Sequence, residues 1–268
     1  MLGTVGFIGC GNIARAMMGG MIKSRVVSPD QIIASNRSFR ILEEVQTNYG
    51  IRISQDNKTV AKEADMLFLT VTSKSYPEVI AEIKDFIRDT TVVILIAVGE
   101  TIEKNEKRFS RPMKIAKAMP NTPALVQEGI TGIAVNKLVT TQDQENLRVL
   151  FESFGKVVFL DESMMDIVTA IGGSSPAFIY MFIEALADGA VLYGMPREIA
   201  YVIASQAVLG AAKMVLETGL HPGTLKDKVC SPGGVTIESV AMLEERGFRS
   251  AVIEAVRINM EKAKMIHG

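Results

Sequence analysis

A glycine-containing segment near the N-terminus, Gly9-Cys-Gly-Asn-Ile-Ala14, has the residue types and spacing of a phosphate-binding turn. It follows a short apolar run at positions 4–8, and apolar residues recur after it at helical spacing. A strand, a G-x-G-x-x-A turn and a helix in this order are typical of dinucleotide-binding proteins. Gly9 permits the tight turn, Gly11 admits the pyrophosphate, and Ala14 lets the helix pack closely on the strand. We expect a dinucleotide here; the alternative is a glycine turn without a nucleotide.

The residues after the second predicted strand, at positions 31–34, indicate which dinucleotide binds. Proteins that bind NAD place Asp or Glu at the end of this strand, where the carboxylate meets the ribose 2′-hydroxyl. This chain has no acid there and has the sequence Ser35-Asn-Arg-Ser38 instead. A guanidinium with several hydroxyl and amide donors suits a 2′-phosphate. We therefore expect NADP, with NADPH preferred over NADH; the alternative is that Arg37 is a solvated loop residue.

A second glycine turn lies far along the chain, at Ser231-Pro-Gly-Gly-Val-Thr236. Pro232 has no N–H donor, and two consecutive glycines allow backbone conformations that other residues resist. Apolar residues recur at helical spacing after it, so the turn is expected to lead into a helix N-terminus. Free N–H groups and the helix dipole favour a small anion there, such as a carboxylate. The alternative is a plain turn between two helices.

The other reactive residues offer little for metal or triad chemistry. The only cysteines, Cys10 and Cys230, lie far apart without metal-binding spacing, and the only histidines are His221 and His267. We expect no metal ion and no disulfide. His221 precedes a Pro-Gly pair and is expected to be solvated or to cap a helix. Cys230 is expected to be a small packing residue rather than a reactive thiol.

Charge and composition narrow the class of protein. The chain has 268 residues, a net charge of −1 and 48% hydrophobic residues. This charge, without a basic block, argues against nucleic acid or an acidic membrane surface as partners. The uninterrupted apolar runs are much shorter than a membrane span, and Met1 leads almost directly into a predicted strand. We expect a cytoplasmic protein with a sizeable core.

Strand-like and helix-like runs alternate through the first half of the chain. The predicted strands cover 4–8, 31–34, 64–71, 91–98, 114–118, 131–135 and 156–160. Strands that alternate with helices imply an α/β fold with a Rossmann-like, doubly wound parallel sheet. Ligands bind such a sheet beyond the carboxyl ends of its strands. The predicted ends of the first five are Gly9, Ser35, Val71, Ala97 and Met119.

Strand patterns stop after residue 162. Helical patterns follow, interrupted at positions 172–176, and the runs 177–192 and 197–218 carry small apolar residues nearly all round. Helices that are apolar on every side are buried. We therefore expect a helical subunit interface; a plain core is the alternative. The predicted domains are 1–162, which binds the dinucleotide, and 163–268, which is all-helical and serves substrate binding and dimerisation.

With these residues in hand, the chain resembles the pyrroline-5-carboxylate reductase family nearly from end to end. Six segments carry the resemblance: Gly6–Asn12, Met119–Pro123, Ser174–Ala177, Glu184–Gly189, His221–Gly223 and Leu225–Thr236. The last segment is the most specific, whereas the first alone would indicate only a nucleotide binder.

The resemblance implies reduction of 1-pyrroline-5-carboxylate to L-proline, the last step of proline biosynthesis, by hydride transfer from the nicotinamide to the imine carbon. The glycine motif and the segment after the second strand predict these coenzyme-binding residues: Gly9, Cys10, Gly11, Asn12, Ile13, Ala14, Ser35, Asn36 and Arg37. The resemblance implies six more: Asn57, Thr70, Val71, Thr72, Ser73 and Ala97. The implied substrate-binding residues are Glu162, Gly233, Gly234, Val235 and Thr236. The Thr236 hydroxyl would meet the ring nitrogen, as the implied catalytic group. The family is usually a homodimer, sometimes assembled into a decamer.

The chain also departs from the family. Where the family usually has Ala-Val-Lys-Pro, this chain has Thr70-Val-Thr-Ser73, and Ser175 replaces a glycine. These changes affect residues that are expected to line the coenzyme and substrate sites. They leave open reduced activity or an altered coenzyme preference. They also leave open a reductase-like paralogue that acts on another cyclic imine or a β-hydroxyacid, or a non-enzymatic NADP-binding regulatory protein.

Overall fold

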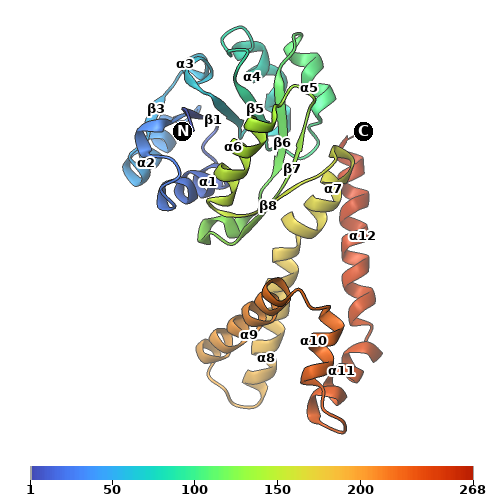
Figure 1. Ribbon diagram of the computed structural model, residues 1–268. Helices are drawn as coiled ribbons and strands as arrows, with labels where there is room; N and C mark the ends of the chain where they lie inside the picture. The colour runs from blue at the N-terminus through green and yellow to red at the C-terminus, as the bar shows by residue number, and fades with distance from the viewer. Residues whose placement is uncertain (1, 268) are drawn as a thin grey trace. The chain divides into compact units, whose positions relative to one another are not determined.

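The computed structural model describes residues 2–267 and divides them into two compact units (Figure 1). Unit 1 comprises residues 2–173 and 260–267, and unit 2 is Ser174–Asn259. The two units are described separately below. The predicted boundary between the dinucleotide-binding domain and the helical domain, at residues 162 and 163, stays a prediction. The two units are defined by compactness and not by function.

Unit 1 is built on an eight-stranded sheet in the order β3-β2-β1-β4-β5-β6-β7-β8. The strands are β1 (Val5–Ile8), β2 (Ile32–Ser35), β3 (Arg52–Ser54), β4 (Met66–Leu69), β5 (Val92–Leu95), β6 (Lys114–Met119), β7 (Gly129–Val135) and β8 (Gly155–Phe159). All residues of β1, β2, β4 and β5 are buried, as expected for parallel strands that helices cover on both faces.

Helices cover both faces of this sheet. They are α1 (Asn12–Lys23), α2 (Phe39–Tyr49), α3 (Asn57–Glu63), α4 (Tyr76–Ile83), α5 (Ile102–Phe109), α6 (Thr141–Glu152) and α7 (Met165–Val168). One core cluster joins α1, α2 and α6 to the sheet through residues such as Met17, Leu42 and Phe151. A second cluster joins α3, α4 and α5 through Val60, Val79 and Phe109. In the first cluster the rings of Phe7 and Phe68 stack with centroids 4.6 Å apart.

The predicted α/β fold with a doubly wound sheet and a helical C-terminal part is confirmed, with two refinements. Strand β3 was not predicted, because only three residues pair at the sheet edge and none of them is fully buried. Strand β7 runs antiparallel to β6, whereas every other neighbouring pair is parallel. The β6–β7 connection is the short segment 120–128, which has no room for a crossover helix, so the chain must turn back.

Unit 2 is all-helical. Its helices are α8 (Ser175–Leu192), α9 (Arg197–Thr218), α10 (Pro222–Val229), α11 (Val235–Glu245) and the first part of α12 (Phe248–His267). The helix interruption predicted at 172–176 lies slightly earlier, because the chain forms a π-helical turn at Thr169–Gly173 and α8 begins at Ser175. Pro176 fits because it lies in the first turn of α8, where no backbone donor is needed.

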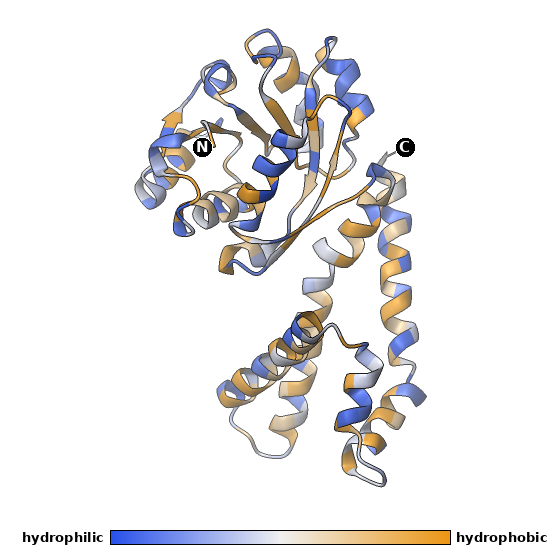
Figure 2. Cartoon of the chain, in the orientation of Figure 1, coloured by the Kyte–Doolittle hydropathy of each residue, from blue (hydrophilic) through white to orange (hydrophobic). Residues whose placement is uncertain are grey.

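The long helices of unit 2 bury little within a single chain. Only Ala187 is buried on α8, and only Ala200 and Ala204 on α9. Figure 2 shows hydrophobic residues along most of both helices. Large apolar side chains therefore face outwards, among them Met181, Leu192, Val202, Leu209 and Leu216.

Two segments, Glu162–Leu192 and Arg197–Thr218, are long and apolar enough by length and composition to cross a membrane. The uninterrupted apolar runs of the sequence are shorter than these helices, which include occasional charged residues. The criterion rests on length and composition alone, and a core helix of a soluble protein meets it too. That this chain has no membrane partner stays a prediction.

Candidate functional site

The turn between β1 and α1 requires glycine. Gly9 has φ +103°, and a Cβ there would lie 2.6 Å from the Thr70 carbonyl oxygen. The Gly9 amide donates to the Ser35 carbonyl at 2.8 Å, which holds the turn against β2. A Cβ on Gly11 would meet no protein atom within 4 Å, so protein packing does not explain that glycine. An open approach to this backbone is what a pyrophosphate needs.

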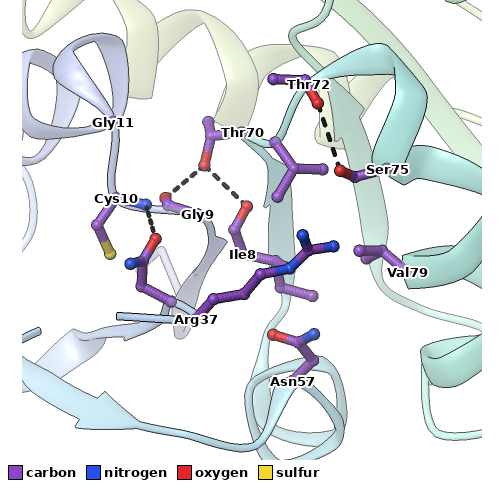
Figure 3. Close-up of a pocket in the computed structure, with 12 residues that line it drawn as sticks. Ile8, Gly9, Cys10, Gly11, Arg37, Asn57, Thr70, Thr72, Ser75 and Val79 are labelled. Carbon is purple, nitrogen blue, oxygen red and sulfur yellow. Dashed lines mark hydrogen bonds between the residues drawn. The ribbon is translucent and has the colours of Figure 1, made fainter. Parts of the chain in front are cut away.

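A pocket lies over this turn and gathers residues from the ends of three predicted strands and from helices α3 and α4 (Figure 3). It is lined by Ile8, Gly9, Cys10, Gly11, Asn36, Arg37, Asn57, Thr70, Val71, Thr72, Ser75 and Val79. Most of the predicted coenzyme residues therefore line one pocket. The exceptions are Asn12, Ile13, Ala14, Ser35, Ser73 and Ala97, and the coenzyme role of every predicted residue stays a prediction.

The floor of the pocket is held by side chains that bond to backbone. The Asn36 amide oxygen accepts from the Cys10 N–H at 3.2 Å. The Thr70 hydroxyl donates towards the Gly9 and Ile8 carbonyl oxygens, at 2.7 and 3.0 Å (Figure 3). Buried or partly buried groups of this kind stay in one position, so the turn is preformed.

Cys10 lies in the turn but is buried, and its thiol donates to the Ser35 carbonyl oxygen at 3.6 Å. Burial raises the pKa of the Cys10 thiol to about 11, although the charge of Arg15 opposes the shift. The thiol is therefore neutral at physiological pH. A neutral buried thiol acts as a packing group and not as a nucleophile.

The end of the pocket beyond β2 carries both the expected cation and unexpected acids. Arg37 Nη2 lies 3.1 Å from Glu78 Oε2, with about three quarters of each side chain exposed. An ion pair this exposed contributes little and can be displaced by a stronger anion. Asn57 accepts from the buried Ser35 hydroxyl at 2.7 Å and donates to Glu82 at 2.8 Å. Ser35 thus orients Asn57.

The wall on the β4 and β5 side is held by Tyr76, whose role sequence reasoning missed. The buried Tyr76 hydroxyl donates to the Leu69 carbonyl at 2.7 Å. It accepts from the amides of Ile96 and Ala97 at 3.1 and 3.3 Å. Burial raises the pKa of Tyr76, so the hydroxyl keeps its proton. The backbone of Ala97, a predicted coenzyme-binding residue, is therefore held in place by Tyr76.

Glu162 makes two contacts that the sequence did not indicate. Its Oε1 accepts from the Ile102 N–H at the start of α5, at 2.8 Å, and lies 4.0 Å from the Lys117 ammonium. Burial lowers the pKa of Lys117, while the nearby carboxylate of Glu162 opposes that shift. The Glu162 side chain is still 30% exposed. Its predicted contact with substrate stays a prediction.

In unit 2, the turn at 231–236 has the conformation that the sequence predicted. The Gly234 amide donates to the Ser231 carbonyl at 3.1 Å, and Gly233 has φ +68°. Gly234 is the N-cap of α11, so the turn leads directly into a helix N-terminus. A Cβ on Gly234 would lie 2.5 Å from Ser231 Oγ. The predicted capping role of His221 is also seen, because its Nδ1 accepts from the Gly223 amide at 3.1 Å.

The residues of the pocket fit a bound NADP. The glycine turn leaves the backbone open, the α1 N-terminus follows it, and Asn36 and Arg37 supply donors at the rim. Within residues 2–267, no group of three or more His, Cys, Asp or Glu side chains is arranged to hold a metal ion.

Comparison with known proteins agrees with both parts of this picture. Residues 162–266 match the family described as pyrroline-5-carboxylate reductase dimerisation, and residues 4–99 match the family described as NADP oxidoreductase, coenzyme F420-dependent. Pyrroline-5-carboxylate reductase of Escherichia coli is 46% identical over 262 residues, 98% of this chain and 97% of the relative.

Solved structures agree as well. A pyrroline-5-carboxylate reductase from Coxiella burnetii has a TM-score of 0.93 and 33% identity, with both chains fully covered. The pyrroline carboxylate reductase of Plasmodium falciparum, solved with NADP bound, has a TM-score of 0.89 and 30% identity, with 99% of this chain and 98% of that chain covered. These similarities, over nearly the whole length of a chain with a preformed NADP-type pocket, place it in the pyrroline-5-carboxylate reductase family.

Proposed function

We propose that this chain reduces 1-pyrroline-5-carboxylate to L-proline with NADPH, as the last step of proline biosynthesis in the cytoplasm. The observation that carries the proposal is the 46% identity to a curated pyrroline-5-carboxylate reductase over 98% of the chain. The preformed glycine pocket in unit 1 supports the coenzyme half, and the glycine turn before α11 supports the substrate half.

NADPH is the proposed preferred coenzyme. Arg37 and the donors beside it suit the 2′-phosphate, and no acid follows β2 to accept from a free 2′-hydroxyl. A phosphate also carries more charge than the Glu78 carboxylate that now contacts Arg37, so it can displace that exposed partner. When bound, the coenzyme supplies a hydride from nicotinamide C4.

The substrate carboxylate is proposed to lie on the backbone amides of Gly234, Val235 and Thr236. These groups begin α11, where unpaired N–H groups and the helix dipole favour an anion. The Thr236 hydroxyl would meet the ring nitrogen, and Gly233 supplies the turn that exposes the amides. Glu162, whose side chain is 30% exposed, is proposed as a further substrate contact.

The reaction asks little of acid–base side chains. A protonated imine is already electrophilic, so orientation of the two reactants and electrostatic stabilisation can supply most of the rate enhancement. This requirement agrees with a chain that has only two histidines, one of which caps α10. The exposed apolar faces of α8 and α9 support a homodimer, in which a second copy covers them, and further assembly to a decamer is compatible with that interface.

An assay of NADPH oxidation with 1-pyrroline-5-carboxylate tests the proposal. We expect oxidation equal to the L-proline formed, and much slower oxidation with six-membered cyclic imines. Faster turnover of the larger imines would favour a paralogue with another substrate. NADP⁺ reduction with a β-hydroxyacid would favour a hydroxyacid dehydrogenase, and tight NADPH binding without oxidation by any imine would favour a regulatory protein.

A further inference from the structure

A buried carboxylate outside the assigned site stands out in unit 1. The side chain of Glu100 is 0% exposed. Its Oε1 accepts from the Ser73 hydroxyl, and its Oε2 accepts from Arg108 Nη1 and, at 2.9 Å, from Asn105 Nδ2. Lys104 Nζ lies 3.8 Å away. Three donors from two segments of the chain therefore converge on one carboxylate.

This arrangement keeps Glu100 charged. Burial alone would raise the pKa of the carboxyl, but hydrogen bonds from Ser73, Asn105 and Arg108 hold the pKa below its ordinary value. A buried carboxylate is tolerated only when its lone pairs are satisfied in this way. Removal of one donor would leave an unsatisfied charge, so the position of each donor is tightly defined.

Two of the connected segments border the coenzyme pocket. Ser73 begins the 3₁₀ turn Ser73–Ser75, directly after the pocket residues Val71 and Thr72, and Ser75 lines the pocket as well. Glu100 follows the backbone of Ala97 beyond β5. The carboxylate thus ties the loop after β4 to the loop after β5 and, through Arg108, to α5.

The strand order indicates which end of the coenzyme these loops meet. The pyrophosphate turn lies between β1 and α1, and the 2′-phosphate donors lie beyond β2, on one side of β1. Strands β4 and β5 lie on the other side of β1. A dinucleotide that crosses the carboxyl edge of the sheet brings its second nucleoside, the nicotinamide riboside, to the loops after β4 and β5.

We propose that Glu100 is a positioning residue that holds the Thr72–Ser75 wall in place for the nicotinamide half of the coenzyme. It acts through Ser73, without touching the coenzyme itself. This inference rests on the proposed use of NADPH and adds a residue for which the glycine motif gives no signal. A purely structural Glu100 would lower stability but leave the coenzyme affinity of the folded protein unchanged.

The experiment measures dissociation constants for NADPH and for adenosine 2′,5′-bisphosphate, which contains the adenosine end alone. For Glu100→Gln we expect about a tenfold weaker NADPH affinity, the size of one hydrogen bond to a charged group, and unchanged binding of the bisphosphate. Glu103→Gln is the matched control, because Glu103 lies only three residues further on, in the first turn of α5, but pairs with Lys107 at the exposed surface. This control should bind both ligands as the unchanged chain does.

Two further variants keep the test decisive if Glu100→Gln does not fold. Arg108→Gln removes the partner on α5, away from the pocket, and should weaken NADPH several-fold while sparing the bisphosphate. Ser73→Ala should weaken NADPH as well, and combining it with Glu100→Gln should add little, because both changes cut the same link.

Several results would overturn the positioning role. One is that the folded Glu100→Gln and Arg108→Gln proteins bind NADPH as tightly as the unchanged chain does. Another is that these variants bind NADPH and adenosine 2′,5′-bisphosphate more weakly by the same factor. Additive losses in the double variant would assign Ser73 a direct contact instead of one through Glu100. Because binding is measured without substrate, loss of the reductase activity proposed above is a separate outcome and can be recognised as such.

Discussion

In unit 1 the residues of the central strands are all buried, whereas in unit 2 the two longest helices bury only three alanines. Both units are rich in apolar residues. Unit 1 buries them by closing helices over two faces of a sheet, so its core is complete within one chain. The helices of unit 2 have no such layer among the residues that the structure describes, and we propose that a second copy covers them. We therefore propose that coenzyme chemistry and assembly are encoded in separate parts of the sequence.

The largest difference between the two units should appear when an exposed apolar residue is replaced by Asp. Val202 on α9 is 69% exposed in the single chain and Val149 on α6 is 40% exposed. Val202→Asp should abolish assembly and with it activity, because it places a charge in the proposed interface. Val149→Asp should leave both unchanged. Light scattering after size exclusion measures the mass, and equal masses for both variants would remove α9 from the interface.

The closed core of unit 1 should respond differently. Phe68 is fully buried between Phe7 and Phe151. Phe68→Ala should lower the free energy of unfolding by about 3–5 kcal/mol. Because this core lies within one chain, the loss should be the same at every protein concentration, as measured by denaturant unfolding. A loss that disappears at high concentration would mean that unit 1 also depends on assembly.

Substitutions in unit 2 should affect turnover without affecting coenzyme binding. Thr236→Ala, in unit 2, should lower kcat about a hundredfold, as does loss of a hydrogen-bond donor aimed at a reacting group, and leave NADPH affinity unchanged. Gly234→Val should also weaken inhibition by L-proline, because a side chain there crowds the amides beside Ser231. Unchanged proline inhibition in the glycine variant would count against a carboxylate at this turn.

Arg37→Ala, in unit 1, should give the opposite pattern. We expect the Michaelis constant for NADPH to rise about tenfold, the effect of losing one charge-assisted contact, with that for NADH nearly unchanged. Inhibition by L-proline should not change. Equal effects on NADPH and NADH would remove Arg37 from recognition of the 2′-phosphate.

The smallest effect should come from the thiol of Cys10. Its pKa is raised from 9.0 to about 11 by burial, so the folded state favours the neutral thiol. This contribution is complete below pH 9 and is lost as pH rises from about 9 to about 11, with about 1 kcal/mol lost by pH 10. Unfolding at several pH values measures it, with Cys10→Ala as the control. An equal slope in both proteins would mean that Cys10 ionises normally.

The sequence was sufficient for the parts of this molecule that depend on local pattern. The glycine turn follows from Gly9 and Gly11, whose spacing reflects backbone geometry, and the buried strands follow from continuous apolar runs. The turn before α11 was predictable for the same reason, because Pro232 and two glycines restrict the backbone locally. The fold class and the conformation of both glycine turns could therefore be predicted from the sequence, whereas the ligands of these turns stay predictions.

The parts that could not be predicted depend on contacts between distant residues. Glu100 and Ser73 are 27 positions apart, and no spacing rule indicates that they share a hydrogen bond. Tyr76 likewise joins two strand ends through its hydroxyl, although its position in the sequence reads as an ordinary helix start. Strand β3 was missed because a short edge strand has almost no apolar signal. Long-range polar contacts leave no periodic pattern.

The most direct test of the proposed reaction follows the hydride itself. NADPH that carries deuterium at the transferable C4 position is incubated with the protein and 1-pyrroline-5-carboxylate, and the product is analysed by mass spectrometry and NMR. We predict one deuterium per L-proline at the former imine carbon, in an amount equal to the NADPH oxidised. NADPH oxidation without deuterated proline, or bound NADPH that is never oxidised, would contradict the assignment of this chain as an imine reductase.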